Sequence, residues 1–328
     1  MKKIILSFDY ELFFGDRSGT VKKTLIEPTD LLMDALEKNG LRGNFFIDYL
    51  MFRALEKDID DERVASDLTL LKQQVRDMVR RGHRIELHLH PHWIDARYNG
   101  DGTWNFENFT HYSLISLGKD VVTSMFKEGV AYLKLLIYDV APNYKVCAFR
   151  AGGWAVQPFS HICDGLRATG ISIDSSSCYG TYEHHDYSQF DFREIPHKAI
   201  YKFQDDLNVE CHKGEFIEIP ISSYRRLLMY KGLDWISKRY STVMTRMTDG
   251  SHGRKTEKMQ NRRPHLFNYC MLTMSISTFS CVLLSIFSIK PLLVYIDHPK
   301  DLHLATLKTI KVLSKFCDSK FYYDYLSS

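Results

Sequence analysis

The sequence lacks the features that mark several classes of protein. Its seven cysteines are odd in number, widely scattered and include no Cys-x-x-Cys pair, so we expect no disulfide framework. No excess of one charge is present either, because 43 Lys and Arg against 40 Asp and Glu give a formal net charge of +3. Repeats, low-complexity tracts and flexible linkers are also missing. We therefore expect a single globular domain over residues 1–328.

Two apolar segments raise the question of a secretion signal or a membrane span. Residues 4–6 are followed at once by Ser7 and Asp9, so the run is too short for the apolar core of a signal peptide. Residues 266–289 carry no charged side chain but contain seven serines and threonines, which a buried helix tolerates better than a lone spanning helix does. We expect a buried helix there, and a cytoplasmic protein that meets its substrate inside the cell.

Short runs typical of β-strands alternate with segments of helical periodicity. The expected strands are residues 4–8, 44–47, 84–89, 145–149, 171–173, 216–219 and 292–296. The clearest expected helices are residues 28–40, 67–81 and 158–170, with Asp67 as the N-cap of the second. Strands that alternate with helices run parallel, so the sequence predicts an α/β fold, a distorted (β/α)7 barrel with insertions near residues 98–112 and 224–263.

Polar side chains follow the expected strands at the end where barrel enzymes carry their chemistry. They are Asp9 and Glu11, then His88, His90 and His92, then Arg150, Asp174 and His298. A catalytic zinc, or another borderline divalent ion, is bound by carboxylates and imidazoles and keeps one coordination position open. Each residue also has a structural alternative: Asp9 could cap a helix, Arg150 could form a surface ion pair, and His298 could be a packed loop histidine. Their joint placement at one barrel mouth carries the prediction of a site.

The order and content of these motifs resemble the polysaccharide deacetylase family, the carbohydrate esterases with a nodulation-deacetylase homology domain. The likeness spans residues 4–302 and is strongest to deacetylases of lipopolysaccharide and O-antigen biosynthesis. The motifs that carry it are Phe8-Asp9-Tyr10-Glu11, residues 44–47, Gly82-His83, the His88-x-x-x-His92 pair, Arg150-Ala151-Gly152-Gly153-Trp154, Asp174 and His298-Pro299.

The resemblance implies a metal-dependent hydrolase that removes an N-acetyl group from a sugar in surface-polysaccharide biosynthesis. The implied metal is zinc, with cobalt, nickel or manganese as alternatives. The resemblance implies that Asp9 is the general base and His298 the general acid. It implies that Glu11, His88 and His92 bind the metal, with His90 as the alternate ligand. Arg150 would pair with Asp9, Asp174 would orient a neighbouring side chain, and Gly153 and Trp154 would contact the substrate or its oxyanion.

Two departures from the family pattern keep other functions open. Tyr10 stands where the family has a second aspartate, so the metal carboxylate would be Glu11, and this requires the chain to have left regular strand geometry there. Gly152 replaces a proline and loosens the loop before Gly153. The alternatives are an inactive carbohydrate-binding or scaffold protein with this fold, and a hydrolase of a non-sugar amide.

One segment is strongly basic. Residues 224–263 contain eleven Lys and Arg against three Asp and Glu, a local net charge of +8. It is either a solvated insertion or a docking surface for a nucleotide-linked or lipid-linked sugar diphosphate or for anionic lipid headgroups, which would allow peripheral membrane contact. Nucleic acid is not an expected partner, because aromatic residues do not interleave with the basic ones as stacking platforms would.

Overall fold

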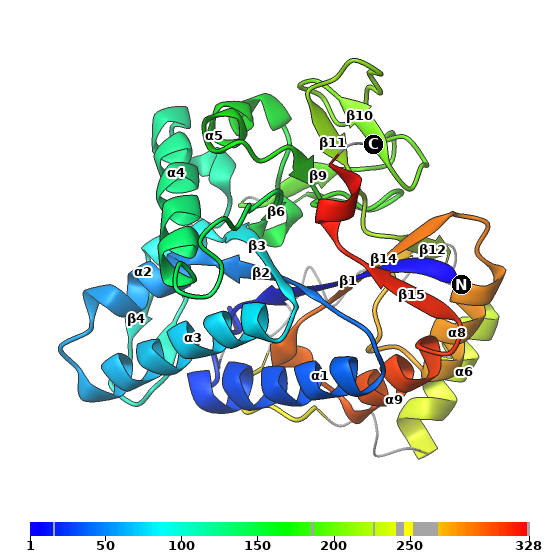
Figure 1. Cartoon of the computed structure of the whole chain (residues 1–328), viewed down its shortest axis with the longest axis horizontal. Helices are drawn as coiled ribbons and strands as arrows, with labels where there is room; N and C mark the ends of the chain where they lie inside the picture. The colour runs from blue at the N-terminus through cyan, green and yellow to red at the C-terminus, as the bar shows by residue number, and fades with distance from the viewer. Residues whose placement is uncertain (16, 185–186, 226, 241–245, 252–267, 327–328) are drawn as a thin grey trace.

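The computed structural model describes residues 1–328 except 16, 185–186, 226, 241–245, 252–267 and 327–328. A strongly curled and mostly parallel sheet lies at its centre (Figure 1). Its parallel strands are β1 (Lys2–Tyr10), β2 (Asn44–Asp48), β3 (Arg84–Leu89), β6 (Ala148–Ala151), β7 (Ile173–Asp174), β11 (Phe216–Glu218) and β14 (Leu292–Asp297). Each of the seven predicted strands is present. The predicted α/β class with a distorted barrel is therefore confirmed.

The strands lie in the order β11-β7-β6-β3-β2-β1-β14, and every neighbouring pair is parallel. Two further strands extend this sheet. β10 (Tyr201–Phe203) pairs antiparallel with β11, and β15 (Cys317–Lys320) runs parallel to the first half of β1. The fourth and fifth strands begin three and two residues later than predicted, which brings Arg150 into β6 and Asp174 into β7.

The curled sheet is an incomplete barrel. Within the described residues β11 and β14 share no ladder. The chain just beyond β11 bridges the gap, since Ser222 N donates to Val294 O (3.0 Å) and Val294 N donates to Ser222 Oγ (2.9 Å). Leu272 extends the bridge by donating to Ser222 O and accepting from Ile296 N. Hydrogen bonds from two separate segments, at Ser222 and Leu272, thus take the place of a closing ladder.

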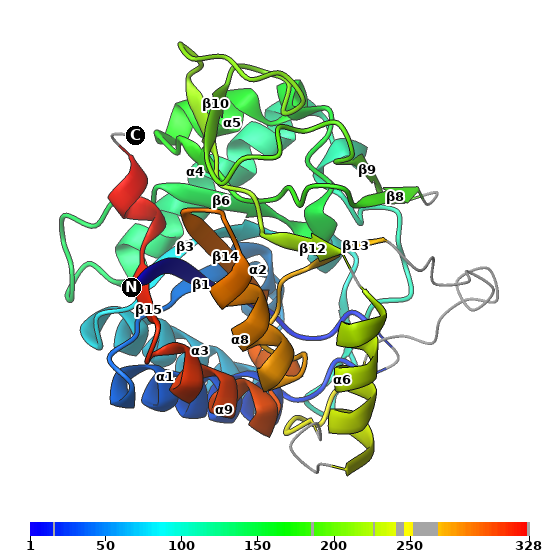
Figure 2. The same cartoon turned by 90° about the vertical axis from the view of Figure 1, so that its right-hand side faces the viewer.

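Helices cover the outer face of the sheet (Figures 1 and 2). They are α1 (Glu27–Lys38), α2 (Tyr49–Lys57), α3 (Glu62–Arg80), α4 (Lys119–Leu136), α5 (Cys163–Thr169), α6 (Leu228–Tyr240), α8 (Thr278–Phe287) and α9 (Leu304–Leu313). Short π- and 3-10 turns lie at Lys22–Ile26, Pro91–Ile94, Leu114–Ser116, Gly152–Trp154, Phe159–His161, Pro299–Asp301 and Tyr322–Tyr325. The outward side chains of the strands pack beneath these helices, whereas Ile5, Phe46, Ile173 and Val294 fill the barrel interior.

The prediction of Asp67 as the N-cap of the third helix is wrong. Asp61 caps α3, because its Oδ1 accepts hydrogen bonds from Arg63 N (2.9 Å) and Val64 N (3.1 Å). Asp67 lies inside the helix instead. Val64, which is buried, begins the apolar face one turn earlier than the sequence pattern had suggested. The ends of α1 and α5 agree with the sequence, each followed by a glycine in the left-handed conformation, Gly40 and Gly170.

The apolar segment at residues 266–289 differs from the single buried helix expected there. It contains β13 (Tyr269–Met271), which pairs antiparallel with β12 (Ser223–Arg225), followed by the ten-residue helix α8. The buried side of α8 carries Ser280 and Ser285, whereas Phe287 is 75% exposed. Ser285 Oγ donates to Cys281 O at 2.8 Å, so the hydroxyls are satisfied locally. Within the described ranges, no helix combines the length and apolar character that crossing a bilayer requires.

The two predicted insertions both contact the loop after β1, because Trp104 N donates to Ser18 Oγ and Ser251 N donates to Arg17 O. The first forms the hairpin of β4 (Arg97–Tyr98) and β5 (Trp104–Asn105) and continues to Tyr112. The second begins with β12 and α6, and α6 lies beside α8 (Figure 2). Six of the eleven basic residues of the second insertion lie outside the described residues. A separate hairpin joins β8 (Tyr182–His184) to β9 (Gln189–Asp191).

Candidate active site

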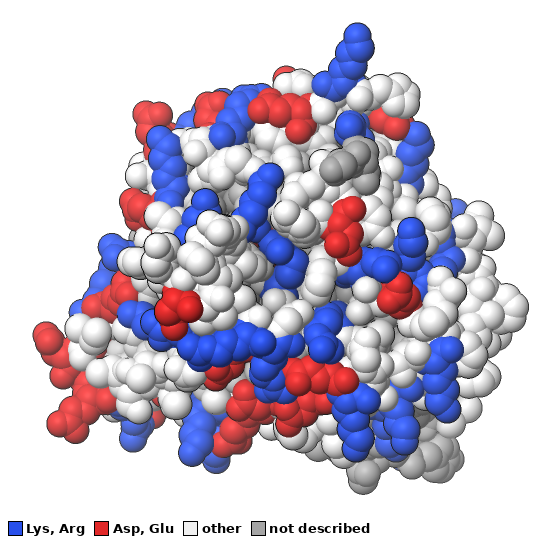
Figure 3. All heavy atoms as spheres, viewed as in Figure 1, with Lys and Arg blue, Asp and Glu red and all other residues white. Residues whose placement is uncertain are grey.

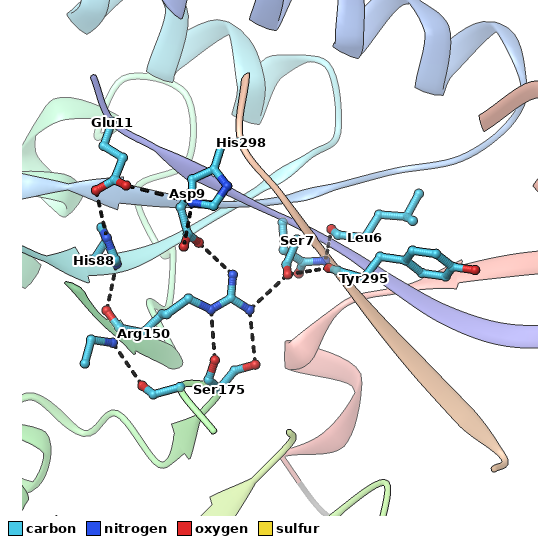
Figure 4. Close-up of polar contacts among 12 residues, drawn as sticks. Leu6, Ser7, Asp9, Glu11, His88, Arg150, Ser175, Tyr295 and His298 are labelled. Atoms are coloured by element: carbon cyan, nitrogen blue, oxygen red, sulfur yellow. Dashed lines mark hydrogen bonds and ion pairs between the residues drawn. The ribbon is translucent and has the colours of Figure 1, made fainter. Parts of the chain in front are cut away.

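β1 places two consecutive side chains on opposite faces of the sheet. Asp9 points into the barrel, whereas Tyr10 points outward and donates from its hydroxyl to Gln74 Oε1 of α3 at 2.7 Å. β1 ends at Tyr10, so Glu11 lies beyond the strand and on the same side as Asp9 (Figure 4). The condition that the sequence set for Glu11 is met, and Tyr10 has a packing role on the other face.

Arg150 holds Asp9 in a fully buried ion pair. Its Nη1 donates to Asp9 Oδ1 at 2.6 Å, and its Nε donates to Ser175 O at 2.8 Å (Figure 4). Nη2 donates to Ser7 Oγ (2.9 Å) and Tyr322 OH (3.1 Å). The pairing that the family resemblance implies for Arg150 is present, and the remaining donors of the guanidinium fix its orientation.

Asp174 organises the turn that wraps around Arg150. Its carboxylate accepts from Ser176 N (3.0 Å) and Ser176 Oγ (2.8 Å), and Ser176 Oγ accepts from Ala151 N (2.9 Å). Burial and the neighbouring charge of Asp174 raise the pKa of Glu218 well above its ordinary value. Asp174 thus orients the serine turn and the strand end before Gly152, and it lies one layer away from Asp9.

Glu11 is the most heavily paired carboxylate of the cluster. Its Oε2 accepts from His88 Nε2 at 3.2 Å, and its Oε1 accepts from Lys300 Nζ at 2.7 Å. Burial acts to raise the pKa of Glu11, but Lys300 and His88 outweigh it and hold the pKa well below its ordinary value. Glu11 is therefore a buried carboxylate with a cation on each oxygen.

His88 carries a proton on both ring nitrogens. Nδ1 donates to Arg150 O at 2.8 Å, and Nε2 faces Glu11. Burial favours the neutral ring, but the hydrogen bond with Glu11 and the charges of Asp9 and Glu11 raise the pKa of His88 to about 9. The imidazolium joins the end of β3 to the end of β6.

His298 lies between the two carboxylates. Its Nε2 is 3.6 Å from Asp9 Oδ2 and 3.8 Å from Glu11 Oε1. Burial and the nearby charge of Lys300 lower the pKa of His298, so its ring is neutral at pH 7. Its side chain is 20% exposed, whereas those of Asp9 and Glu11 are 4% and 6% exposed. Of these three residues, His298 is the one that meets solvent.

The two histidines that follow β3, His90 and His92, point elsewhere. His92 Nε2 donates to Phe106 O at 3.1 Å, and its ring lies against Phe109 with centroids 4.6 Å apart. The ring of His90 packs between Phe14 (4.1 Å) and Tyr112 (4.9 Å). The structure therefore brings Asp9, Glu11, His88, Arg150 and His298 together, and it places His90 and His92 among aromatic rings beside them.

The predicted metal ligands do not converge. Among the described residues, no group of three or more His, Cys, Asp or Glu side chains is arranged to hold a metal ion. Glu11 and His88 meet, but His92 is hydrogen-bonded to the backbone of the first insertion and Lys300 contacts Glu11. The residues as placed do not fit the three-ligand site that the resemblance implies.

The loop after β6 is held in an uncommon backbone conformation. Gly153 (φ 60°) and Trp154 (φ 57°) are both left-handed, which strains the bulky side chain of Trp154. A Cβ on Gly152 would lie 2.5 Å from the ring of His90, which leaves no room for the proline of the family pattern. Trp154 is half-buried and packs against Ile221 and Ile296.

A surface cavity of about 810 Å³ lies elsewhere in the molecule. Its walls come from residues 157–160, β8, β9, Arg193 and residues 205–208, apart from Leu207. None of these residues belongs to the cluster around Asp9 and Glu11. We place the candidate active site at the barrel mouth because buried charged side chains and a neutral histidine meet there.

Sequence reasoning missed three residues of the site. Lys300 lies two residues after His298, so its position next to the His-Pro pair could have indicated it. Ser175 opens a run of three serines, which by itself is typical of a turn, yet both its carbonyl and its hydroxyl contact Arg150. Tyr322 comes from the last turn of the chain and carries no sequence signal, because only the fold brings it to Arg150.

Comparisons with known proteins give likenesses of fold alone. No family model matches the sequence. No curated protein matches it either. Among solved structures, a protein described as a polysaccharide deacetylase from Mycobacterium smegmatis aligns with 97% of this chain and 85% of its own, with a TM-score of 0.48 and 13% identity.

Two further solved structures are similar at the same level. The catalytic domain of a peptidoglycan N-acetylglucosamine deacetylase from Eubacterium rectale aligns with 98% of this chain and 89% of its own (TM-score 0.35, 12% identity). A 4-alpha-glucanotransferase from Thermococcus litoralis aligns with all of this chain and 40% of its own (TM-score 0.47, 12% identity). These proteins resemble the chain in fold, and the function has to be argued from the site.

Proposed function

We propose that this chain is a hydrolase that removes the acetyl group from the nitrogen of an N-acetylated sugar. The observation that carries the proposal is the arrangement of Asp9 and His298: a buried carboxylate fixed by Arg150 lies 3.6 Å from a neutral, solvent-facing imidazole. A base and a proton carrier side by side are what amide hydrolysis requires. The order of the motifs, which resembles that of polysaccharide deacetylases, supports the same reaction class.

The two oxygens of Asp9 have different partners. Oδ1 accepts from Arg150, whereas Oδ2 faces His298. Oδ2 is therefore the atom that would take a proton from the water attacking the acetyl carbonyl. His298 rests neutral, so it can accept this proton from Asp9 Oδ2 and pass it to the sugar nitrogen as the C–N bond breaks. The products are acetate and the free amine.

The substrate we propose is a precursor whose sugar is attached to a nucleotide or lipid diphosphate. The support is the local charge of +8 in residues 224–263, which suits an anionic group at a distance from the acetyl group. A precursor of this kind belongs to surface-polysaccharide biosynthesis. Contact with an anionic membrane face would use the same charge.

A carbohydrate-binding protein without activity is the second candidate. The observation that favours it is the lack of three converged metal ligands within the described residues. The same residues would also hydrolyse a non-sugar amide, so the substrates tested have to include both kinds.

The experiment is a measurement of acetate release. UDP-N-acetylglucosamine, other nucleotide-linked N-acetyl sugars and N-acetylated amino acids would be compared for the wild type, Asp9→Asn and His298→Gln. We expect acetate from at least one sugar, and a loss of about 100-fold or more in either variant. His184→Gln is the matched control, because His184 is exposed on β8.

Each outcome of this experiment decides something. Acetate from N-acetylated amino acids alone would move the proposal to a non-sugar amidase. Sugar binding with no acetate release, with and without added zinc, cobalt, nickel or manganese, would favour the binding protein. Full activity in Asp9→Asn with intact circular dichroism would overturn the assignment of the base.

A further inference from the structure

Lys300 is a buried cation at the centre of the site. It is 4% exposed and lies on the short turn Pro299–Asp301, directly after His298. Its Nζ donates to Glu11 Oε1 (2.7 Å) and to Leu12 O (3.0 Å), and it lies 5.0 Å from the ring centroid of Phe14. A lysine buried to this extent needs such partners, because an unpaired ammonium would be costly to bury.

Lys300 and a divalent ion would compete for the same carboxylate. Lys300 Nζ donates to Oε1 of Glu11, and His88 Nε2 contacts Oε2, so both oxygens already have hydrogen-bond partners. An ion ligated by Glu11 would stand within a few ångströms of the ammonium, where two positive charges repel strongly in a buried site. Binding of an ion by Glu11 therefore requires Lys300 to leave.

We propose that Lys300 is the resident cation of this site: it supplies the positive charge beside Glu11 that the family resemblance assigns to a metal, and it keeps divalent ions away from Glu11. Glu11 and Lys300 then form a fixed ion pair beside Asp9 and His298. This inference goes beyond the proposed deacetylation, because it concerns which cation occupies the site whether or not a sugar is hydrolysed.

The test is a metal titration without substrate. Protein freed of metals by dialysis would be titrated with Zn²⁺ by calorimetry and with Co²⁺ by its visible absorption. The proteins compared would be the wild type, Lys300→Met and Lys300→Arg. We expect weak binding by the wild type, at least about tenfold tighter binding by Lys300→Met, and wild-type behaviour for Lys300→Arg, which keeps the charge.

Two controls locate the effect. Adding Glu11→Gln to Lys300→Met should abolish the gained affinity, because the freed carboxylate is the new ligand. Lys198→Met removes a lysine from another Lys–Glu pair, with Glu210, which lies on the surface. This variant should bind metal like the wild type.

Three results would overturn the inference. The first is one tightly bound ion per wild-type chain that is lost in His88→Ala, because the metal would then be resident. The second is equal affinity in the wild type and Lys300→Met with both folded by circular dichroism. If Lys300→Met does not fold, Lys300→Gln takes its place. The third result is then equal metal affinity in the wild type and Lys300→Gln.

Discussion

At the scale of single residues, Arg150 connects the site to the fold. It is fully buried, lies over the ring of Phe46 at 4.2 Å and binds Asp9. Its partners come from β1, the turn after β7 and the last turn of the chain. The same side chain therefore sets the orientation of the candidate base and joins the two ends of the sequence.

Replacing Arg150 with methionine should lower the free energy of unfolding by about 3–5 kcal/mol, because Asp9 would remain as a buried charge without its partner. Asp9→Asn in the same chain should recover part of this loss. Urea unfolding followed by circular dichroism measures both.

The matched control for that prediction is Arg193→Met. Arg193 also pairs with an aspartate, Asp191, but both side chains are about half exposed. Loss of this pair should change stability little, since exposed ion pairs contribute little. Equal losses in the two variants would contradict the role given to Arg150.

At the scale of elements, the ends of helices and the contacts between them carry stability. Asp61 caps the start of α3, and the buried side chain of His83 joins α1 to the start of β3. His83 Nδ1 accepts from Gly43 N at 3.0 Å, and its Nε2 lies 3.2 Å from Glu37 Oε1. The Asp61 cap and the His83 contacts can each be tested by a single substitution.

Asp61→Ala should destabilise the protein by about 1 kcal/mol, because two backbone N–H groups at the start of α3 lose their acceptor. Asp67→Ala is the comparison. Burial raises the pKa of Asp67 to about 6, and alanine suits a helix interior better, so this variant should not lose stability. Thermal unfolding of both variants decides between the two candidate caps. A larger loss for Asp67→Ala would show that the cap was assigned to the wrong residue.

The stability should fall in acid partly through His83. Burial lowers the pKa of His83 to about 4 from an ordinary 6.5, so between these values the folded state binds fewer protons than the unfolded state. The contribution of neutral His83 to the free energy of unfolding is complete above about pH 6.5. It is lost as the pH falls toward 4, by at most about 1.4 kcal/mol per pH unit.

His83→Gln keeps an acceptor for Gly43 and a donor for Glu37 but does not titrate. The free energies of unfolding of the wild type and His83→Gln would be measured at several pH values from 7 to 4. As the pH falls, the wild type should lose more free energy of unfolding than the variant does. A difference that stays constant over this range would assign the acid sensitivity to other groups.

At the scale of the whole molecule, the curled sheet collects residues from nearly the full length of the chain at one mouth. Asp9 and Glu11 follow the first strand, and His298 and Lys300 follow the last of the seven, which is the neighbour of the first. On the face seen in Figure 3, Lys and Arg are interspersed with Asp and Glu, as the small net charge leads one to expect. In the sequence, residues 224–263 carry a local net charge of +8.

Replacing Arg262 and Arg263 with alanine should weaken the binding of a nucleotide-diphosphate sugar, and the loss should shrink as salt is added, because both effects arise from charge. Lys311→Ala with Lys315→Ala removes the same charge from an exposed position of α9 and an exposed position just after it, and serves as the control. Calorimetry at two salt concentrations measures the affinities. Unchanged affinity in the arginine variant would remove the docking hypothesis.

The sequence by itself determined the seven parallel strands and, to within a few residues, where they end. Period-2 alternation sends Asp9 inward and Tyr10 outward, and parallel strands bring their carboxyl ends to one edge. These are local rules, so they also predicted that Arg150 and His298 would lie near Asp9. The helix ends at Gly40 and Gly170 follow from local backbone preference in the same way.

Only the tertiary structure decided which groups complete the site. His92 turns to Phe106 because the first insertion packs over it, and Lys300 reaches Glu11 because the turn after β14 folds back across the end of β1. The apolar segment at residues 266–289 divides into a strand and a helix because β12 offers a pairing edge to its first part. These outcomes depend on contacts between residues far apart in the chain, and no periodicity within a segment encodes them.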